Sequence, residues 1–272
     1  MKLSEVYKIA DAIAPKRLSD EYCRTAGAYD NSGLLVECCE EVTGIVCSLD
    51  LTNAAIDKAI ANGANLIITH HPVIYGKIDH VCLGDQGLLG GKLIRCIQAG
   101  ISVMSMHLNL DVAKDGIDES LMDGILLATG ETTGAGMRSV AIQHPVDGGG
   151  YGRVYDVKGL TLQALAEGMK GVFSTEKVLT YGDLKQEITR VASFCGAGVD
   201  ERAIFFAKGM GAQVVISSDF KHHLIQLLVE SGMSVIVMTH YASEQYGFEK
   251  YYKKIRERVD IPCVYHVEDT LF

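Results

Sequence analysis

The chain has 272 residues, 48% of them hydrophobic and 7% aromatic, which excludes a disordered protein and suits one large or two ordinary domains. Its net charge of -9, without a run of basic residues, argues against nucleic acid as the main partner. No apolar segment is long enough to cross a bilayer, no signal region is visible, and the eight cysteines show no C-x-x-C spacing. We therefore expect a cytoplasmic protein without disulfides and without a membrane partner.

The first half of the chain predicts alternating strands and helices. Apolar residues at helical spacing predict a helix over residues 3–14, which Pro15 ends. A turn cluster at 29–33 then precedes the apolar pair Leu34-Leu35. Strands are predicted at 45–49, 66–69 and 101–106, and helices at 54–61, 85–99 and 117–128. This alternation is typical of parallel strands joined by right-handed crossovers.

The pattern changes near residue 130. A Gly-rich stretch at 130–136 is typical of a linker, and the segments after it predict an α+β domain. The last core strand, at 234–239, leads into a helix that ends near residue 258, and a strand at 261–267 closes the chain. The predicted fold class is α/β, a two-domain βα-repeat chain with a discontinuous first domain. We predict a first domain at 1–129, a second at 130–235, and a return of residues 236–272 to the first domain.

The strand at 66–69 runs directly into His70-His71-Pro72. Ligands of open α/β sheets bind at the carboxyl ends of the strands, where these two imidazoles would lie. Pro72 favours an extended conformation for His71. The pair alone is equally compatible with two metal ligands and with one buried structural histidine beside one exposed histidine.

Two further predicted strands are each followed by a histidine and a carboxylate. His107 and Asp111 follow the strand at 101–106, and His240 and Glu244 follow the strand at 234–239. The spacing of four places His240 and Glu244 on one helix face, where such a pair is by itself most often a surface contact. Because three predicted strands are followed by potential metal ligands, a shared site is favoured instead. Its predicted donors are His70, His71, Asp111, His240 and Glu244.

This donor set contains nitrogen and oxygen but no thiolate. It suits zinc, manganese, iron, cobalt or nickel, and it disfavours a structural zinc–thiolate site. Five donors are few for one closed ion and suit two open ions that share a carboxylate, so we predict two divalent ions per chain at the domain interface. Two ions roughly 3.5–4 Å apart can activate a water and stabilise a leaving oxygen.

Three other histidines have more than one possible role. His107 is either a further ligand or a side chain that hydrogen-bonds a ligand. His222 and His223 are adjacent near the start of a predicted helix, so at most one of them would face the site. That one could move protons, whereas a capping or surface role explains the pair equally well.

Seven short motifs, spread over nearly the whole chain, resemble those of one known family. They are YDNSGL at 29–34, SLD at 48–50, ITHHP at 68–72, HLNLD at 107–111, GRV at 152–154, the stretch 219–223 and HYASE at 240–244. The family is that of the YbgI-like proteins, related to yeast NGG-interacting factor three and known as type-two homologues of GTP cyclohydrolase I. This chain lacks the large central insertion of longer members, and Leu108 stands where Thr is common.

The resemblance implies a dinuclear metal centre on a two-domain α/β chain that assembles as a toroidal homohexamer. The family's metal positions fall on His70, His71, Asp111, His240 and Glu244, with Glu244 as the bridge. We expect a metal-dependent hydrolase of a small, nucleotide-like substrate, in which Glu244 or Asp111 orients the water as the catalytic group. The alternative is a non-catalytic metal-binding assembly, a metal donor or a regulatory protein. A pocket of basic or aromatic residues beside the metals would favour the hydrolase.

Overall fold

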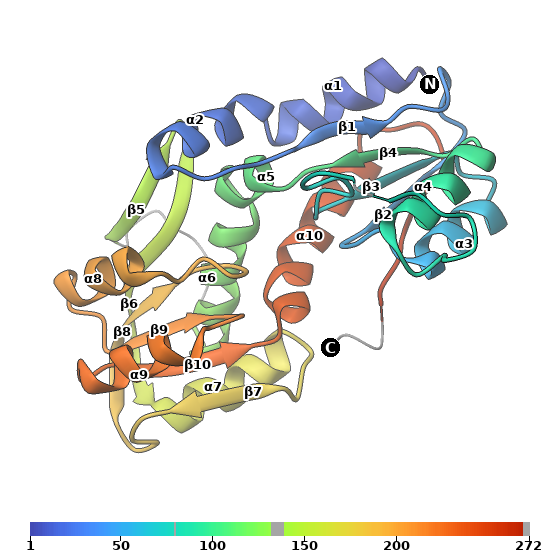
Figure 1. Ribbon diagram of the computed structural model, residues 1–272. Helices are drawn as coiled ribbons and strands as arrows, with labels where there is room; N and C mark the ends of the chain where they lie inside the picture. Colours follow the sequence, from blue (N-terminus) through green and yellow to red (C-terminus); the bar gives the residue numbers. More distant parts are fainter. Residues whose placement is uncertain (79, 132–138, 269–272) are drawn as a thin grey trace. The chain divides into compact units, whose positions relative to one another are not determined.

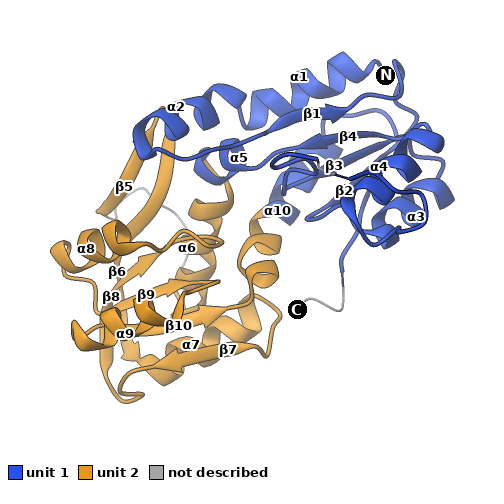
Figure 2. Ribbon diagram, in the orientation of Figure 1, with its two compact units in different colours: residues 1–113, 248–268 blue, residues 114–247, 269–272 orange. Residues whose placement is uncertain are grey.

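The computed structural model describes residues 1–78, 80–131 and 139–268, and their contacts form two compact units (Figures 1 and 2). Unit 1 comprises Met1–Ala113 and Phe248–Glu268, and unit 2 comprises Lys114–Gly247. The sequence analysis placed the boundaries after residues 129 and 235. The contacts instead group α6 (Ile117–Ala128) with unit 2, because this helix packs against α7 (Leu162–Val172) and β6 (Gly149–Thr161).

Unit 1 is built on a five-stranded sheet in the order β1-β4-β3-β2-β11. All strands are parallel except β1, which pairs antiparallel with β4. Every residue of β2, β3 and β4 is buried, as expected for parallel strands covered on both faces. The strands are β1 (Gly33–Val36), β2 (Ile45–Ser48), β3 (Leu66–Thr69), β4 (Ser102–Ser105) and β11 (Cys263–Tyr265). The C-terminal strand thus returns to the sheet of unit 1, which confirms the predicted discontinuous domain.

Helices α3 and α4 cover one face of this sheet. Ile56 of α3 and Cys96 of α4 share a buried cluster with Val46, Ile67 and Val103 of the three central strands. Two helices, α2 and α5, were not predicted, and they contact each other. The helices of unit 1 are α1 (Leu3–Ile13), α2 (Lys16–Ala26), α3 (Asn53–Ala61), α4 (Leu89–Gln98) and α5 (Leu108–Val112).

Unit 2 is built on a six-stranded mixed sheet in the order β5-β6-β8-β9-β10-β7. Only β8, β9 and β10 run parallel, and the outer strands pair antiparallel. Besides β6, the strands are β5 (Val140–Val146), β7 (Val178–Tyr181), β8 (Glu187–Ser193), β9 (Val214–Ser217) and β10 (Ser234–Met238). Most of the predicted linker and the start of the predicted strand at 138–143 lie outside the described residues.

Two helices of unit 2 begin at side chains that cap them. The Thr161 hydroxyl accepts the Ala164 N–H at the start of α7, and Asp200 accepts the Ala203 N–H at the start of α8. The remaining helices are α8 (Glu201–Gly209), α9 (His222–Glu230) and α10 (His240–Arg256), and the last of these continues from unit 2 into unit 1. Among the described helices, none combines the length and the apolar character needed to cross a membrane.

Candidate metal centre

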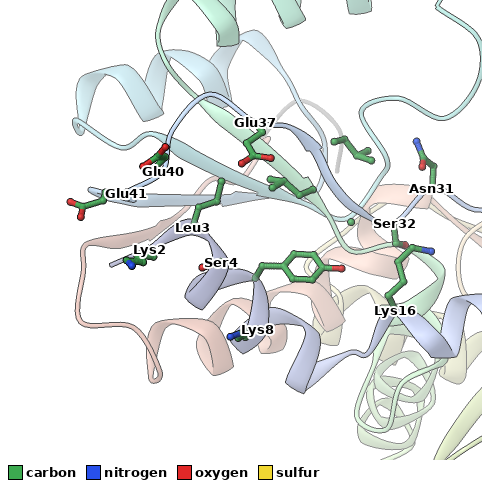
Figure 3. A pocket seen from close by; sticks show the side chains of 14 residues that line it. Lys2, Leu3, Ser4, Lys8, Lys16, Asn31, Ser32, Glu37, Glu40 and Glu41 are labelled. Carbon is green, nitrogen blue, oxygen red and sulfur yellow. The ribbon is translucent and has the colours of Figure 1, made fainter.

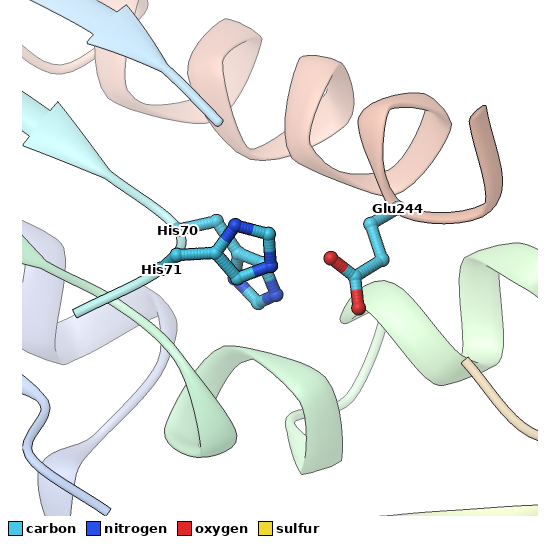
Figure 4. Close-up of side chains that lie close together, drawn as sticks. All are labelled: His70, His71 and Glu244. Atoms are coloured by element: carbon cyan, nitrogen blue, oxygen red, sulfur yellow. The ribbon is translucent and has the colours of Figure 1, made fainter. Parts of the chain in front are cut away.

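The parallel pairing of β3 with β4 places their carboxyl ends side by side in unit 1. His70 and His71 follow β3, and His107 follows β4 and precedes α5, which carries Asp111. The ring of His70 lies 4.9 Å from the ring of His71 (Figure 4) and 5.3 Å from that of His107. His70, His107 and Asp111 each offer a donor atom within 4.8 Å of the others. Asp111 lies in the short helix α5 (Leu108–Val112).

The hydrogen bond of His70 fixes which of its nitrogens can bind a metal. Its Nδ1 lies 2.7 Å from the Met106 carbonyl oxygen. A carbonyl only accepts hydrogen bonds, so Nδ1 carries the proton and a neutral ring has its lone pair on Nε2. This Nε2 lies 3.4 Å from Oδ1 of Asp111, and both side chains are buried. When the ring is neutral both atoms are acceptors, so a cation placed between them would have a ligand atom on each side.

That geometry fits a transition metal. Metal–nitrogen and metal–oxygen bonds of about 2.0–2.2 Å separate two ligand atoms by roughly 3–3.5 Å. The separation between His70 Nε2 and Asp111 Oδ1 falls in this range. The residues present in unit 1 are therefore suited to hold a divalent ion.

Carboxylates orient the other two imidazoles of unit 1. His71 Nδ1 lies 2.7 Å from Oδ1 of Asp50, and His107 Nδ1 lies 2.8 Å from Oδ1 of Asp30. In both histidines Nδ1–H donates to a carboxylate, which leaves Nε2 for a metal, the usual arrangement of ligating histidines. The sequence analysis did not assign these aspartates a role, although both lie in motifs that it singled out. A carboxylate therefore orients His107 in the same way as it orients His71.

Asp30 is the centre of a buried hydrogen-bond network. It accepts hydrogen bonds from the hydroxyls of Ser19 and Ser32, both at 2.5 Å, besides that from His107. Burial alone would raise the pKa of Asp30, but the hydrogen bonds from His107, Ser19 and Ser32 outweigh it and hold that pKa well below its usual range. Because Ser19 belongs to α2, the unpredicted helix helps to position a histidine of the site.

We expect Asp30→Asn to destabilise the protein by about 2–3 kcal/mol at pH 7, since it breaks charge-assisted hydrogen bonds in a buried network. The lowered pKa means that ionised Asp30 stabilises the fold above about pH 4, and this contribution is lost as the pH falls below that value. Denaturant unfolding at pH 7 and pH 3 should therefore show a difference between variant and wild type that shrinks in acid. Asp20→Asn, on the exposed face of α2, is the matched control and should unfold like the wild type. An equal loss in both variants would contradict the network.

Unit 2 contributes a second pair of donors. His240 begins α10 and Glu244 lies one turn later, with His240 Nε2 3.0 Å from Oε2 of Glu244. His240 Nδ1 lies 2.6 Å from Oδ2 of Asp219. Asp219 has a φ of 45°, a left-handed conformation that is uncommon outside glycine and often marks functional positions. The Glu244 carboxylate, drawn on its helix in Figure 4, is 3% exposed.

The turn after β8 lies against this pair. Gly196 has a φ of 56°, and a Cβ atom at this position would overlap Oε1 of Glu244 and lie 3.4 Å from Cε1 of His240. A glycine is therefore required on two grounds, its backbone conformation and the close approach of the carboxylate. In the sequence, Gly196 stands in the short stretch Gly196-Ala197-Gly198.

We expect Gly196→Ala to displace the Glu244 carboxylate and to lower the affinity of the protein for divalent metal by about 10–100-fold, the usual effect of disturbing a ligand's surroundings. Equilibrium dialysis against Zn²⁺ would measure this. The control is Gly171→Ala in α7, where nothing lies within 4 Å of the added methyl group. Metal affinity that is unchanged in Gly196→Ala would show that Glu244 takes no part in binding.

His222 and His223 lie in the first turn of α9, and both are exposed. Neither forms a hydrogen bond or an ion pair in the part of the chain that the structure describes. A surface role accounts for what the structure records of them. Their proposed part in proton transfer stays a prediction.

Two exposed tyrosines lie beside the histidines of unit 1. Tyr29 is 58% exposed and Tyr75 is 48% exposed. Their rings meet edge to face with centroids 5.3 Å apart, and the Tyr75 hydroxyl donates to the Tyr29 carbonyl oxygen at 3.0 Å. The ring of Tyr75 is also 5.8 Å from that of His107. These two tyrosines offer aromatic surface next to the candidate ligands, a feature that the sequence analysis did not identify.

A groove of about 870 Å³ lies in unit 1 between α1 and the edge strand β1 (Figure 3). Its charged lining is mixed, with three lysines and three glutamates: Lys2, Lys8, Lys16, Glu37, Glu40 and Glu41. None of the predicted metal ligands lines it. The groove is therefore separate from the candidate metal ligands at the ends of β3 and β4.

Comparisons of the sequence with a family model and with known proteins point to the same family. A model of the family Duf34/NIF3 (NGG1p interacting factor 3) matches residues 1–269. A Clostridium perfringens protein named GTP cyclohydrolase 1 type 2 homolog is 31% identical over 265 residues, which is 96% of this chain and 93% of that protein. A Schizosaccharomyces pombe protein named Protein NIF3 homolog is 26% identical over 253 residues, covering 89% and 84% of the two chains.

Solved structures share the fold. A Staphylococcus aureus protein superposes with a TM-score of 0.78 at 24% identity and covers 99% of this chain and 97% of its own. A Bacillus cereus protein related to NIF3 also gives a TM-score of 0.78, at 18% identity, with coverage of 98% and 97%. The fold predicted from the sequence is confirmed.

Proposed function

The chain belongs to the Duf34/NIF3 family, and from this premise we propose that it is a dinuclear metal-dependent hydrolase of a small substrate. One observation carries the proposal. His70 Nε2 and Asp111 Oδ1 lie 3.4 Å apart in a buried place, a separation that suits two ligands of one divalent ion.

We propose further that the donors of the two units form one centre with two ions. The resemblance of the motifs at 68–72, 107–111 and 240–244 to those of the family supports this. The proposed ligands are His70, His71, Asp111, His240 and Glu244, with Glu244 as the bridge and His107 beside them.

The residues of the chain have separate tasks in this proposal. The bound ions would supply Lewis acidity and make a water acidic enough to lose a proton near neutral pH. Asp111 would orient this water and hold its proton, because it is a buried carboxylate beside the imidazole of His70. Asp50, Asp30 and Asp219 keep the imidazole rings in one tautomer and one orientation.

The substrate in this proposal carries a planar ring. Tyr29 and Tyr75 offer aromatic surface beside His107, and base–aromatic stacking contributes about 1–3 kcal/mol per ring. Several relatives carry the name GTP cyclohydrolase 1 type 2 homolog, which makes purine nucleotides the first compounds to test.

The proposal is tested by metal analysis of the purified chain, followed by a substrate screen with zinc, manganese, iron, cobalt and nickel. The screen includes GTP and other purine nucleotides, and the controls are metal-free protein and Tyr75→Ala. We expect close to two ions per chain and turnover that depends on them, with a raised KM in Tyr75→Ala. Full metal content without turnover of any compound would instead support the non-catalytic metal-binding alternative. Absence of transition metal would overturn both.

We also propose that the protein assembles as a homohexamer, as its family resemblance implies. Light scattering at micromolar concentration should then give a mass about six times the 29.4 kDa of one chain. The measurement is best repeated with and without chelator, to show whether metal and assembly are linked. A mass of one chain under both conditions would remove the proposal.

A further inference from the structure

The Glu244 carboxylate has a close neighbour at each of its two oxygens. Its Oε2 lies 3.0 Å from Nε2 of His240, and its Oε1 occupies the place where a Cβ atom on Gly196 would overlap it. The side chain is 3% exposed. The main chain at Gly196 is therefore the wall against which this carboxylate rests, and a shift of that wall would move a proposed metal ligand.

The turn that contains Gly196 is attached to a buried carboxylate. Asp118 lies in the first turn of α6 and is 0% exposed. Its Oδ1 accepts the N–H of Cys195 at 3.1 Å, and its Oδ2 accepts the N–H of Gly152 at 3.0 Å and a hydrogen bond from the guanidinium of Arg153. One carboxylate thus connects α6, strand β6 and the turn after β8.

The other side of the turn is attached to the end of β9. The carbonyl oxygen of Gly196 accepts the hydroxyl of Ser217 at 3.0 Å and that of Ser218 at 2.6 Å. The turn is therefore held by Asp118 on the side of its preceding peptide and by two serine hydroxyls on the other. It cannot move relative to Glu244 without the loss of buried hydrogen bonds.

The same end of α6 also contacts the helix that carries Glu244. At Gly247, just after Glu244 in α10, a Cβ atom would lie 3.0 Å from Cα of Ile117 and 3.0 Å from Cβ of Ser120. The absence of a side chain at Gly247 thus lets the two helices approach closely. Ile117 is adjacent to Asp118, so this end of α6 contacts the main chain of α10 directly and reaches the turn after β8 through the carboxylate.

The energetics of the buried ion pair point to a role in positioning. Asp118 and Arg153 are both at most 2% exposed. Removing two charges from water costs free energy that well-packed apolar side chains would avoid, so stability alone is a weak reason for such a pair. An ionised carboxylate instead accepts N–H groups from two segments at once in a defined geometry. Fixed surroundings of this kind keep a metal ligand in place.

Resting on the proposed function, we propose that Asp118 is a positioning residue of the metal centre. It holds the turn at Gly196 against Oε1 of Glu244, and the turn keeps this carboxylate beside His240. Asp118 acts through the turn and does not itself bind the ion. Its effect on metal binding is therefore separable from its effect on the stability of the fold.

The experiment measures the Zn²⁺ affinity of chelator-treated full-length protein by competition with a chromophoric chelator, and the denaturant unfolding of the same proteins without metal. Asp118→Asn keeps the size of the side chain but replaces one acceptor oxygen by a donor, so the N–H of Cys195 or the groups at Oδ2 lose their partner. We expect its Zn²⁺ affinity to fall by about 10–100-fold. Leu165→Ala, at a fully buried position of α7, should unfold at lower denaturant and keep the wild-type affinity.

A second comparison tests whether Asp118 acts through the turn. Gly196→Ala and Asp118→Asn disturb the same carboxylate, so together they should lower the Zn²⁺ affinity by less than the product of their separate effects. Losses that multiply would overturn the proposal. If Asp118→Asn does not fold, Tyr151→Phe replaces it, because the Tyr151 hydroxyl donates to the carbonyl oxygen of Cys195. Its removal should lower the affinity several-fold, and an unchanged affinity would overturn the proposal.

The outcomes separate the positioning role from the proposed function. A wild type that binds Zn²⁺ together with an Asp118→Asn variant of equal affinity overturns the positioning role and leaves the metal centre standing. Equal losses of affinity in Asp118→Asn and Leu165→Ala overturn it too, because they would reflect general destabilisation. If the wild type binds no Zn²⁺, the proposed function fails and the positioning role fails with it.

Discussion

Replacing Glu244 by Ala should reduce the metal content from close to two ions per chain to near zero. A bridging carboxylate serves both ions, so its removal takes one ligand from each and leaves their like charges unscreened. Glu244 is 3% exposed and its Oε2 lies 3.0 Å from Nε2 of His240, so its carboxylate is held in a buried place. Elemental analysis of protein purified without chelator measures the effect.

Two further variants separate metal binding from helix stability. Glu244→Gln keeps the size of the side chain but cannot bridge two cations as a carboxylate does, and it should lose metal as well. Glu249→Ala, on the same helix, removes an exposed glutamate whose Oε1 lies 2.8 Å from Nζ of Lys253. This control should keep its metal, because exposed ion pairs contribute little. Full occupancy in Glu244→Ala would refute the bridge, and loss of metal in Glu249→Ala would indicate a general effect of the helix.

Chelation should lower the melting temperature strongly at pH 8 and hardly at all at pH 5. A ligand that binds only the folded state at 1,000 times its Kd stabilises it by about 4 kcal/mol, which corresponds to roughly 10 °C in a protein of this size. The metal contribution is therefore one of the largest single effects expected here. Thermal melts with and without chelator, in steps of pH from 8 to 5, would measure it.

The direction of this pH dependence follows from the ligands. Imidazole binds metal only when neutral, and its ordinary pKa is about 6.5, whereas carboxylates compete with protons only near pH 4. Metal-derived stability is thus present above about pH 7 and lost as the pH falls toward 5. A chelator effect that stays constant down to pH 5 would contradict a centre rich in histidine. A loss confined to pH 4 and below would indicate a site of carboxylates.

Regular elements and the place of the candidate site could be predicted from the sequence. The strand predicted at 66–69 and the helix predicted at 117–128 coincide with β3 and α6. Both depend on local information, a short apolar run in one case and helical periodicity with an acidic first turn in the other. The parallel pairing of β2, β3 and β4 followed from the alternation of strands and helices, and it brings His70, His71 and His107 to one edge.

Helix α2 shows why other elements could not be predicted. Only Leu18 and Ser19 of its residues are buried, so its sequence lacks a strong apolar face, and the helix is held by its contact with α5. Helix α5 has five residues, too few for a periodic signal. The two helices pack against each other, and local propensity does not record such a contact.

The sequence by itself determined which residue types stand at the strand ends, because strand period and chain order are local properties. Only the tertiary structure decided which groups orient those side chains and hydrogen-bond with them. Asp30 and His107 are 77 residues apart, and Cys195 and Asp118 are also 77 residues apart. Which carboxylate holds an imidazole, and which turn lies against Glu244, depends on packing between distant segments. These contacts depend on distances and desolvation in the folded chain, and the spacing of residues along the sequence does not encode them.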